Sequence, residues 1–162
     1  MILFGCDHAG FQLKEVLLAH LAAKNIATQD FGCYTEESID YPDFAHPVAI
    51  AVSKNPEALG VLICGSGNGI NMTANKHSGI RSALCWKKEI AVLARQHNNA
   101  NILALPARFL TNEEGIEILT AFLETHFDPI NAKSDGANML DIKYLEKLLK
   151  DLVAIRKTIT KL

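Results

Sequence analysis

Short apolar runs alternate with amphipathic stretches along most of the chain. The apolar runs are continuous, which is typical of parallel strands covered on both faces. Strands are expected at residues 2–5, 26–31, 59–64, 80–85 and 101–105. Helices are expected at 13–21, from 48 onward, and at 70–76, 87–97 and 111–125, the last opening with a capping box of Thr111 and Glu114. Right-handed crossovers then predict a three-layer α/β/α sandwich with an open, Rossmann-like parallel sheet of about five strands.

The end of the chain carries a different pattern. Apolar residues recur there at alternating spacings of three and four, at Leu145, Leu148, Leu152, Ile155, Ile159 and Leu162. This heptad-like spacing predicts a helix whose apolar seam needs a partner surface. The seam can pack on its own domain or on a second subunit, and we expect the second. The prediction is a single domain over 1–162, with 139–162 as a dimerisation helix.

Composition narrows the class of protein. The chain has 162 residues, a length typical of one domain, and a net charge of −2 from 16 basic and 18 acidic residues. This balance gives no electrostatic footprint for nucleic acid or an anionic membrane. No apolar run approaches the ~20 residues that cross a bilayer. We therefore expect a soluble, cytoplasmic protein.

Four cysteines leave two alternatives, disulfides or free thiols. Cys6, Cys64 and Cys85 each end an apolar run, no two cysteines have CxxC spacing, and the fourth is Cys33. A chain long enough to build a real core gains little from disulfides. Four free thiols are the expectation, one of them potentially reactive.

A glycine-rich loop follows the strongest strand, with the sequence Gly65-Ser66-Gly67-Asn68-Gly69. Ahead of a helix, such a loop can turn several backbone N–H groups into one concavity that suits a phosphate or an oxyanion. It is not the dinucleotide fingerprint GxGxxG, because Ile70 stands where that motif requires its third glycine. It is not a P-loop either, because no Gly-Lys-Ser/Thr follows. A purely structural turn is the alternative, although three glycines exceed what a turn requires.

Three further positions are candidates for proton transfer. Cys64 directly precedes the loop, where a thiolate could act as base or nucleophile; alone, it would read as an inert core residue. Asp7-His8 ends the first strand, with helix capping by Asp7 as the plainer interpretation. His97 ends a predicted helix. Cys64, His8 and His97 could instead bind zinc, but no pair has ligand-motif spacing, so no metal site is expected.

Six segments together resemble a known family. They are Gly5 to Gly10, Asp40-Tyr41-Pro42, Ile63 to Ile70, Ala74-Asn75-Lys76, Gly79-Ile80-Arg81 and Arg95-Gln96-His97-Asn98. In this order they are similar to the type B ribose-5-phosphate isomerases, a family that includes galactose-6-phosphate and allose-6-phosphate isomerases. The resemblance covers residues 1 to about 126.

The resemblance implies an aldose–ketose isomerase that needs no metal or organic cofactor. Cys64 then matches the base that moves a proton between C1 and C2 through an enediolate. Ser66 and the backbone amides of residues 65–69 match the groups that hold the developing oxyanion. His97 matches the residue that opens the furanose ring, with Asp7 on the side of the ring oxygen.

The remaining matched positions are contacts to substrate. His8, Tyr41 and Asn98 match sugar contacts, and Arg108 matches a phosphate contact. The family completes each site with the second subunit, so the resemblance implies a homodimer, or a dimer of two such dimers.

One segment departs from the family pattern. Two arginines usually grip the phosphate after the last core helix, but residues 127–141 contain no arginine. Asn131 and Asp135 stand near those positions, and Lys133 is the only cation, so Lys133 and Arg108 are the expected phosphate contacts. Two alternatives to ribose 5-phosphate isomerisation stay open: another sugar as substrate, or a sugar-phosphate-binding protein that has lost turnover.

Overall fold

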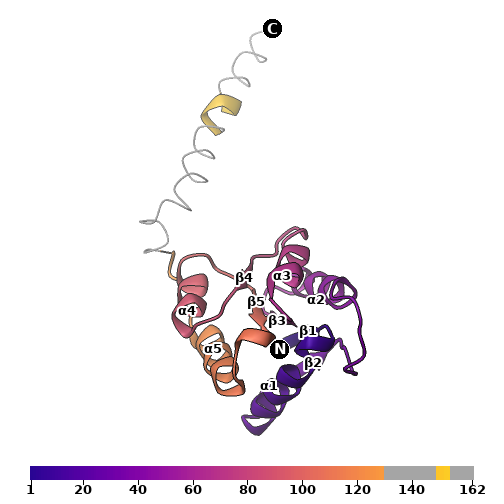
Figure 1. Cartoon of the computed structure of the whole chain (residues 1–162). Helices are drawn as coiled ribbons and strands as arrows, with labels where there is room; N and C mark the ends of the chain where they lie inside the picture. The colour runs from indigo at the N-terminus through magenta and orange to yellow at the C-terminus, as the bar shows by residue number, and fades with distance from the viewer. Residues whose placement is uncertain (130–148, 154–162) are drawn as a thin grey trace. The chain divides into compact units, whose positions relative to one another are not determined.

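The first unit of the chain, Met1–Phe127, is a three-layer α/β/α sandwich (Figure 1). The structure is a computed structural model that describes residues 1–129 and 149–153. Its elements are, in order, β1 (Ile2–Cys6), η1 (His8–Gly10), α1 (Phe11–Ala23), β2 (Thr28–Asp30), α2 (Pro42–Lys54), β3 (Leu59–Cys64), α3 (Asn68–Ala74), β4 (Ser82–Leu84), α4 (Lys88–Gln96), β5 (Ile102–Pro106), η2 (Ala107–Phe109) and α5 (Asn112–Glu124).

All strand pairs are parallel, in the order β2-β1-β3-β5-β4. The register pairs Cys6 with Ile63 and Cys64 with Pro106, so the three central strands end side by side. We call this end of the sheet the carboxyl edge and the opposite end the amino edge. Loops that follow β1, β3 and β5 therefore meet at the carboxyl edge, where open α/β sheets bind their ligands.

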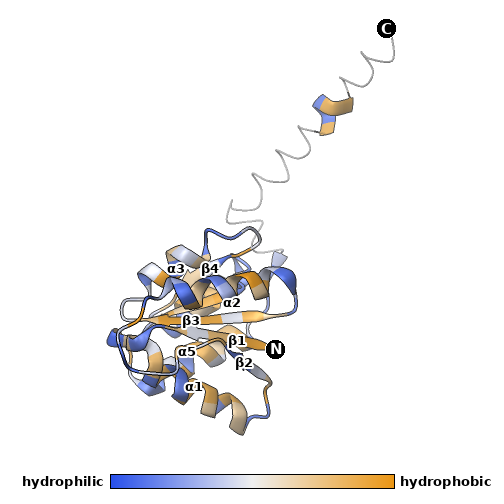
Figure 2. Cartoon of the chain, turned by 90° about the vertical axis from the view of Figure 1, so that its right-hand side faces the viewer, coloured by the Kyte–Doolittle hydropathy of each residue, from blue (hydrophilic) through white to orange (hydrophobic). Residues whose placement is uncertain are grey.

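Side chains of the central strands alternate between two apolar clusters. Phe4, Val61 and Ile63 pack into one cluster, on the face covered by α1, α4 and α5. Leu62 and Cys64 belong to the other, under α2 and α3. Both faces of the sheet are thus buried, which explains why its strands read as continuous apolar runs (Figure 2).

The predicted three-layer fold with five parallel strands is confirmed. β3 spans the predicted residues, and Thr111 and Glu114 form the predicted capping box at the start of α5. The outer strands β2 and β4 are shorter than predicted, three residues each. Each has only one neighbouring strand, so part of its apolar run lies beyond the hydrogen-bonded ladder.

The prediction was wrong about the start of α2. The helix begins at Pro42, six residues before the predicted start at residue 48. A proline fits the first turn of a helix because the missing N–H has no intrahelical partner there. Pro47 also lies inside α2, and it made the early part of this helix look like a loop.

The second unit, Asp128–Leu162, is described only in part. Residues 149–153 are helical, as the apolar spacing predicts, and their side chains Leu149, Leu152 and Val153 are exposed. The other seam residues and Lys133 lie outside the described residues, so the dimerisation helix stays a prediction. In the described part of the chain, no helix is both long and apolar enough to span a bilayer.

Candidate active site

Cys64 occupies the last position of β3 at the carboxyl edge. Its side chain is only 4% exposed, and its Sγ accepts a hydrogen bond from the backbone N–H of Gly67 (3.2 Å). An N–H group that points at a sulfur stabilises negative charge on it. The Gly67 amide therefore fixes the sulfur at the base of the glycine-rich loop.

Gly67 is the residue that allows the loop to fold back onto this sulfur. Its φ is 71°, in the left-handed region, and it forms the N-cap of α3. A Cβ at this position would lie 2.3 Å from Cδ1 of Leu84 and 3.1 Å from the backbone nitrogen of Pro106. Both the backbone conformation and the packing thus require glycine here.

The other two glycines let two predicted substrate contacts approach the loop. A Cβ on Gly65 would lie 3.2–3.3 Å from the Arg108 side chain, and the Arg108 N–H donates to the carbonyl of Gly65 (3.1 Å). A Cβ on Gly69 would lie 2.5 Å from Cζ of Tyr41. Arg108 from η2 and Tyr41, the residue before α2, therefore both lie against the loop beside Cys64.

Asp7 and His8 lie at the same edge, at the end of β1. The Asp7 N–H donates to the carbonyl of Ile63 (3.1 Å), one residue before Cys64. One Asp7 carboxylate oxygen accepts a hydrogen bond from the Gly10 N–H (3.0 Å). Asp7 therefore caps η1, as the plainer interpretation expected, and it does so with one of its two carboxylate oxygens. His8 Nδ1 lies 3.2 Å from both the N–H and the carbonyl of Ile39.

Ser66 and Asn68 form the rim of the loop, and both are exposed. The Asn68 N–H donates to the Ser66 hydroxyl at 3.3 Å. Two loop amides thus have partners within the chain: the Gly67 amide is committed to the Cys64 sulfur, whereas the Asn68 amide holds an exposed hydroxyl that a ligand oxygen could replace.

His97 and Asn98 lie at the opposite edge of the sheet. They follow α4, which runs back from the carboxyl edge, and they precede β5. The Gly60 N–H donates to Asn101 (2.9 Å), which places this turn beside the start of β3. Cys64 lies four positions further along β3 than Gly60, about 13 Å at ~3.3 Å per residue. Within one chain, Cys64 and His97 therefore do not share a site.

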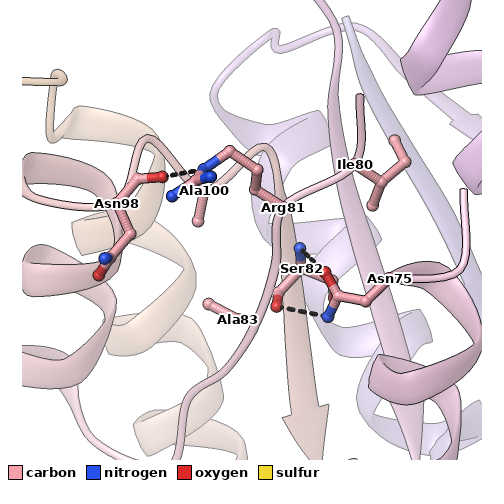
Figure 3. A pocket seen from close by; sticks show the side chains of 7 residues that line it. All are labelled: Asn75, Ile80, Arg81, Ser82, Ala83, Asn98 and Ala100. Carbon is pink, nitrogen blue, oxygen red and sulfur yellow. Dashed lines mark hydrogen bonds between the residues drawn. The ribbon is translucent and has the colours of Figure 1, made fainter. Parts of the chain in front are cut away.

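The Asn98 turn borders a pocket of about 360 Å³ at the amino edge (Figure 3). The Arg81 guanidinium donates to the Asn98 carbonyl, and the Arg81 N–H donates to the Asn101 side chain (2.9 Å). Asn75 exchanges two hydrogen bonds, both 2.9 Å, with the backbone of Ser82. The turn is thus held in place by side-chain bonds at the far end of the sheet.

Sequence reasoning missed a buried cation near the carboxyl edge. The Lys14 ammonium is fully buried and contacts the Asp30 carboxylate (2.5 Å) and the Cys33 carbonyl (2.7 Å). Burial disfavours the charge, but the hydrogen bond and charge of Asp30 together raise the pKa of Lys14. Lys14 directly follows the apolar position Leu13 on α1, and nothing in the periodicity separates it from a solvated lysine.

The predicted thiol state is confirmed, because all four cysteines are free and buried. Burial raises the pKa of Cys85 to about 12, which makes it an unreactive thiol at neutral pH. Among the described residues, no group of three or more His, Cys, Asp or Glu side chains is arranged to hold a metal ion.

The chain is similar in sequence to named isomerases of bacteria. The chain is 45% identical over 129 residues to a probable ribose-5-phosphate isomerase B of Mycoplasma genitalium, covering 78% of this chain and 85% of the relative. It is 42% identical over 127 residues to ribose-5-phosphate isomerase B of Escherichia coli, with the same coverage of both chains.

Solved structures give the same match in three dimensions. The Mycoplasma genitalium ribose-5-phosphate isomerase B with bound ribulose-5-phosphate superposes with a TM-score of 0.79 at 40% identity, covering 88% of this chain and 95% of the other. The Thermotoga maritima ribose 5-phosphate isomerase superposes with a TM-score of 0.77 at 46% identity, covering 79% and 88%. The ribose/galactose isomerase family model matches residues 2–139, and the chain belongs to this family.

Proposed function

We propose that the chain is an aldose–ketose isomerase that interconverts ribose 5-phosphate and ribulose 5-phosphate. The observation that carries the proposal is the Cys64 sulfur, held by the Gly67 amide at the carboxyl edge in a chain of this family. The named relatives are isomerases of this type, and one was solved with ribulose-5-phosphate bound.

Cys64 acts as the base in this proposal. Its thiolate removes the proton from C2 of the open-chain aldose and returns a proton to C1, which converts the aldehyde into the ketose through an enediolate. The negative charge that develops on the substrate oxygen needs fixed donors, and we assign this role to Ser66 and the loop amides. The Gly67 amide contacts the Cys64 sulfur and the Asn68 amide contacts the Ser66 hydroxyl, which supports this assignment. One such donor typically lowers the barrier by about 3–4 kcal/mol.

The ring-opening group comes from a second copy of the chain. Cyclic sugar must open before its C2 proton becomes acidic, and His97 is the family-matched residue for that step. Because the turn that carries His97 lies at the amino edge, at the far end of β3 from Cys64, we assign His97 to the Cys64 of the other chain. A homodimer that sets the amino edge of one subunit against the carboxyl edge of the other supplies His97 and Asn98 across the interface.

Arg108 is the phosphate contact that the geometry supports best. Its guanidinium lies against Gly65 at the mouth of the loop, within reach of a phosphate bound there. Lys133 is the proposed second cation. The lack of arginine in residues 127–141 favours a second candidate, isomerisation of a six-carbon sugar phosphate or of an unphosphorylated pentose.

The proposal is tested by the activity of Cys64→Ala against ribose 5-phosphate, with Cys85→Ala as the matched control. Both variants remove one buried thiol: Cys64 is the last residue of β3, and Cys85 directly follows β4. Loss of a general base predicts a fall in kcat of about a hundred- to ten-thousandfold for Cys64→Ala and little change for Cys85→Ala. Substantial activity in Cys64→Ala would remove Cys64 from its role.

A series of sugars then separates the two candidates. The ratio of kcat/KM among ribose 5-phosphate, six-carbon sugar phosphates and free pentoses identifies the substrate. Saturable binding of sugar phosphate without turnover of any of them would favour a binding protein on an isomerase scaffold.

A further inference from the structure

Two buried thiols outside the proposed proton-transfer step lie in direct contact. The sulfurs of Cys6 and Cys33 are 3.6 Å apart, although the residues are 27 positions apart in the chain. Cys6 ends β1, and Cys33 lies three residues beyond the end of β2. Neither has a role in the isomerase proposal.

The backbones of these two residues are close enough for a covalent link. The Cys33 N–H donates to the Cys6 carbonyl (3.0 Å), and the Cys6 N–H donates to the Gly32 carbonyl (2.7 Å). Backbones joined by such bonds lie about 4.8 Å apart. Disulfides bridge Cα atoms roughly 4.4–6.8 Å apart. A small approach of the two sulfurs is therefore sufficient to form the bond.

We propose that Cys6 and Cys33 are an oxidation site, at which a peroxide converts the two thiols into a reversible intrachain disulfide. The peroxide first oxidises the Cys33 thiol to a sulfenic acid, and one water molecule is released. The Cys6 sulfur then attacks the Cys33 sulfur, a water molecule leaves, and the S–S bond forms. In total, two thiols and one hydrogen peroxide give one disulfide and two waters.

The surroundings explain why Cys33 reacts first. Residues 31–40 form neither helix nor strand, and the side chains of residues 34–38 are exposed, with Tyr34 70% exposed. Such segments open locally at low cost, which brings Cys33 to solvent. The Cys33 thiol donates a hydrogen bond to the Thr35 carbonyl (3.3 Å), so the same opening of this segment frees the sulfur for reaction.

Cys6 is suited to the second step. It is completely buried in the sheet, and burial together with the neighbouring Cys33 raises the pKa of its thiol well above the ordinary value. It therefore stays protonated until a sulfenic acid forms beside it. Cys85 is equally buried, and its thiol donates to the Ala83 carbonyl (3.6 Å) and not to another sulfur, so it is the internal control for oxidation of a thiol outside the pair.

The experiment uses the full-length chain with Cys64→Ser, which removes the loop thiol from the reaction. The folded protein is treated with hydrogen peroxide, its free thiols are blocked with N-ethylmaleimide, and trypsin digestion is followed by mass spectrometry. Cleavage after lysine and arginine separates Cys6 (peptide 1–14), Cys33 (25–54) and Cys85 (82–87). The expected product is peptide 1–14 linked to 25–54, two hydrogens lighter than the sum and separated again by dithiothreitol.

Two controls make the outcome decisive. Cys33→Ala abolishes the linked peptide and leaves Cys6 open to blocking after denaturation. In urea, the same treatment distributes links among all pairs of thiols, so a folded sample must show the 6–33 link in excess. The proposal is overturned if folded protein leaves both thiols free, if Cys33 accumulates as sulfinic or sulfonic acid without a link, or if 6–33 links are no more frequent than in urea.

Discussion

Mixing two inactive variants tests the division of the site between two subunits. Cys64→Ala removes the proposed base and His97→Ala the proposed ring-opening group, and each loss predicts a fall in kcat of about a hundred- to ten-thousandfold. The two residues lie at opposite edges of the sheet, so in a symmetric dimer each site takes Cys64 from one subunit and His97 from the other.

The recovered activity follows from counting sites. When equal amounts of the two variants are unfolded together and refolded, about half of the dimers are mixed, and each mixed dimer has one site with both residues intact. The mixture should therefore regain about a quarter of the wild-type activity with ribose 5-phosphate, measured as ribulose 5-phosphate formed.

A matched control separates this result from simple refolding. Each variant taken alone through the same procedure should stay inactive, and size-exclusion chromatography should show that both remain dimeric. If the mixture also stays inactive while mixed dimers are present, Cys64 and His97 do not act across a two-chain site, and the reasoning from the sheet edges fails.

Three further results are expected. Lys14→Met should lower the free energy of unfolding by about 3 kcal/mol, because it removes the ion pair with Asp30 and leaves the buried Cys33 carbonyl unpaired. Because folding raises the pKa of Lys14, this stabilisation should be complete below pH 10.5, the ordinary pKa of lysine, and should disappear as the pH rises through the pKa of the folded state. Urea titrations of the wild-type chain and of Lys14→Met at several pH values check the size and the pH dependence, and equal stability of the two proteins would contradict both. Gly67→Ala should lower the free energy of unfolding by about 2–5 kcal/mol, because its φ is positive and the new Cβ would lie 2.3 Å from Leu84. Gly79→Ala, with φ 77° and open space around the new Cβ, should lower it by only about 1–2 kcal/mol, from the backbone conformation alone. Similar urea midpoints for the two variants would refute the packing argument. Arg108→Gln should raise KM for ribose 5-phosphate about ten- to a hundredfold and raise KM for a free pentose less. An equal rise for both sugars would show that Arg108 does not bind the phosphate.

The centre of the fold could be predicted from the sequence because burial on both faces leaves a plain pattern. β3 is apolar throughout and runs directly into the glycine-rich loop, and its predicted span was confirmed. The pattern is weaker where one side meets solvent: β2 and β4 lie at the edges of the sheet, and only three residues of each join the ladder. α2 was misjudged because Pro42 and Pro47 suggest a loop when their packing partners are unknown.

The candidate site could be predicted only in part. Topology alone places residues after β1, β3 and β5 at one edge, so Asp7, Cys64 and Arg108 come together as expected. The same topology sends the end of α4, and with it His97, to the other edge. Contacts between distant segments, such as the pairing of Cys6 with Cys33, leave no periodic signal and appear only in the folded chain.

The most direct test of the isomerase proposal is proton NMR of ribose 5-phosphate in D₂O with purified, chelator-treated protein. The account predicts that ribulose 5-phosphate appears with deuterium at C1, because the proton held by Cys64 in the enediolate state exchanges with solvent, and that Cys64→Ala produces neither signal. Absence of ribulose 5-phosphate with the wild-type chain, or equal conversion by Cys64→Ala, would contradict it.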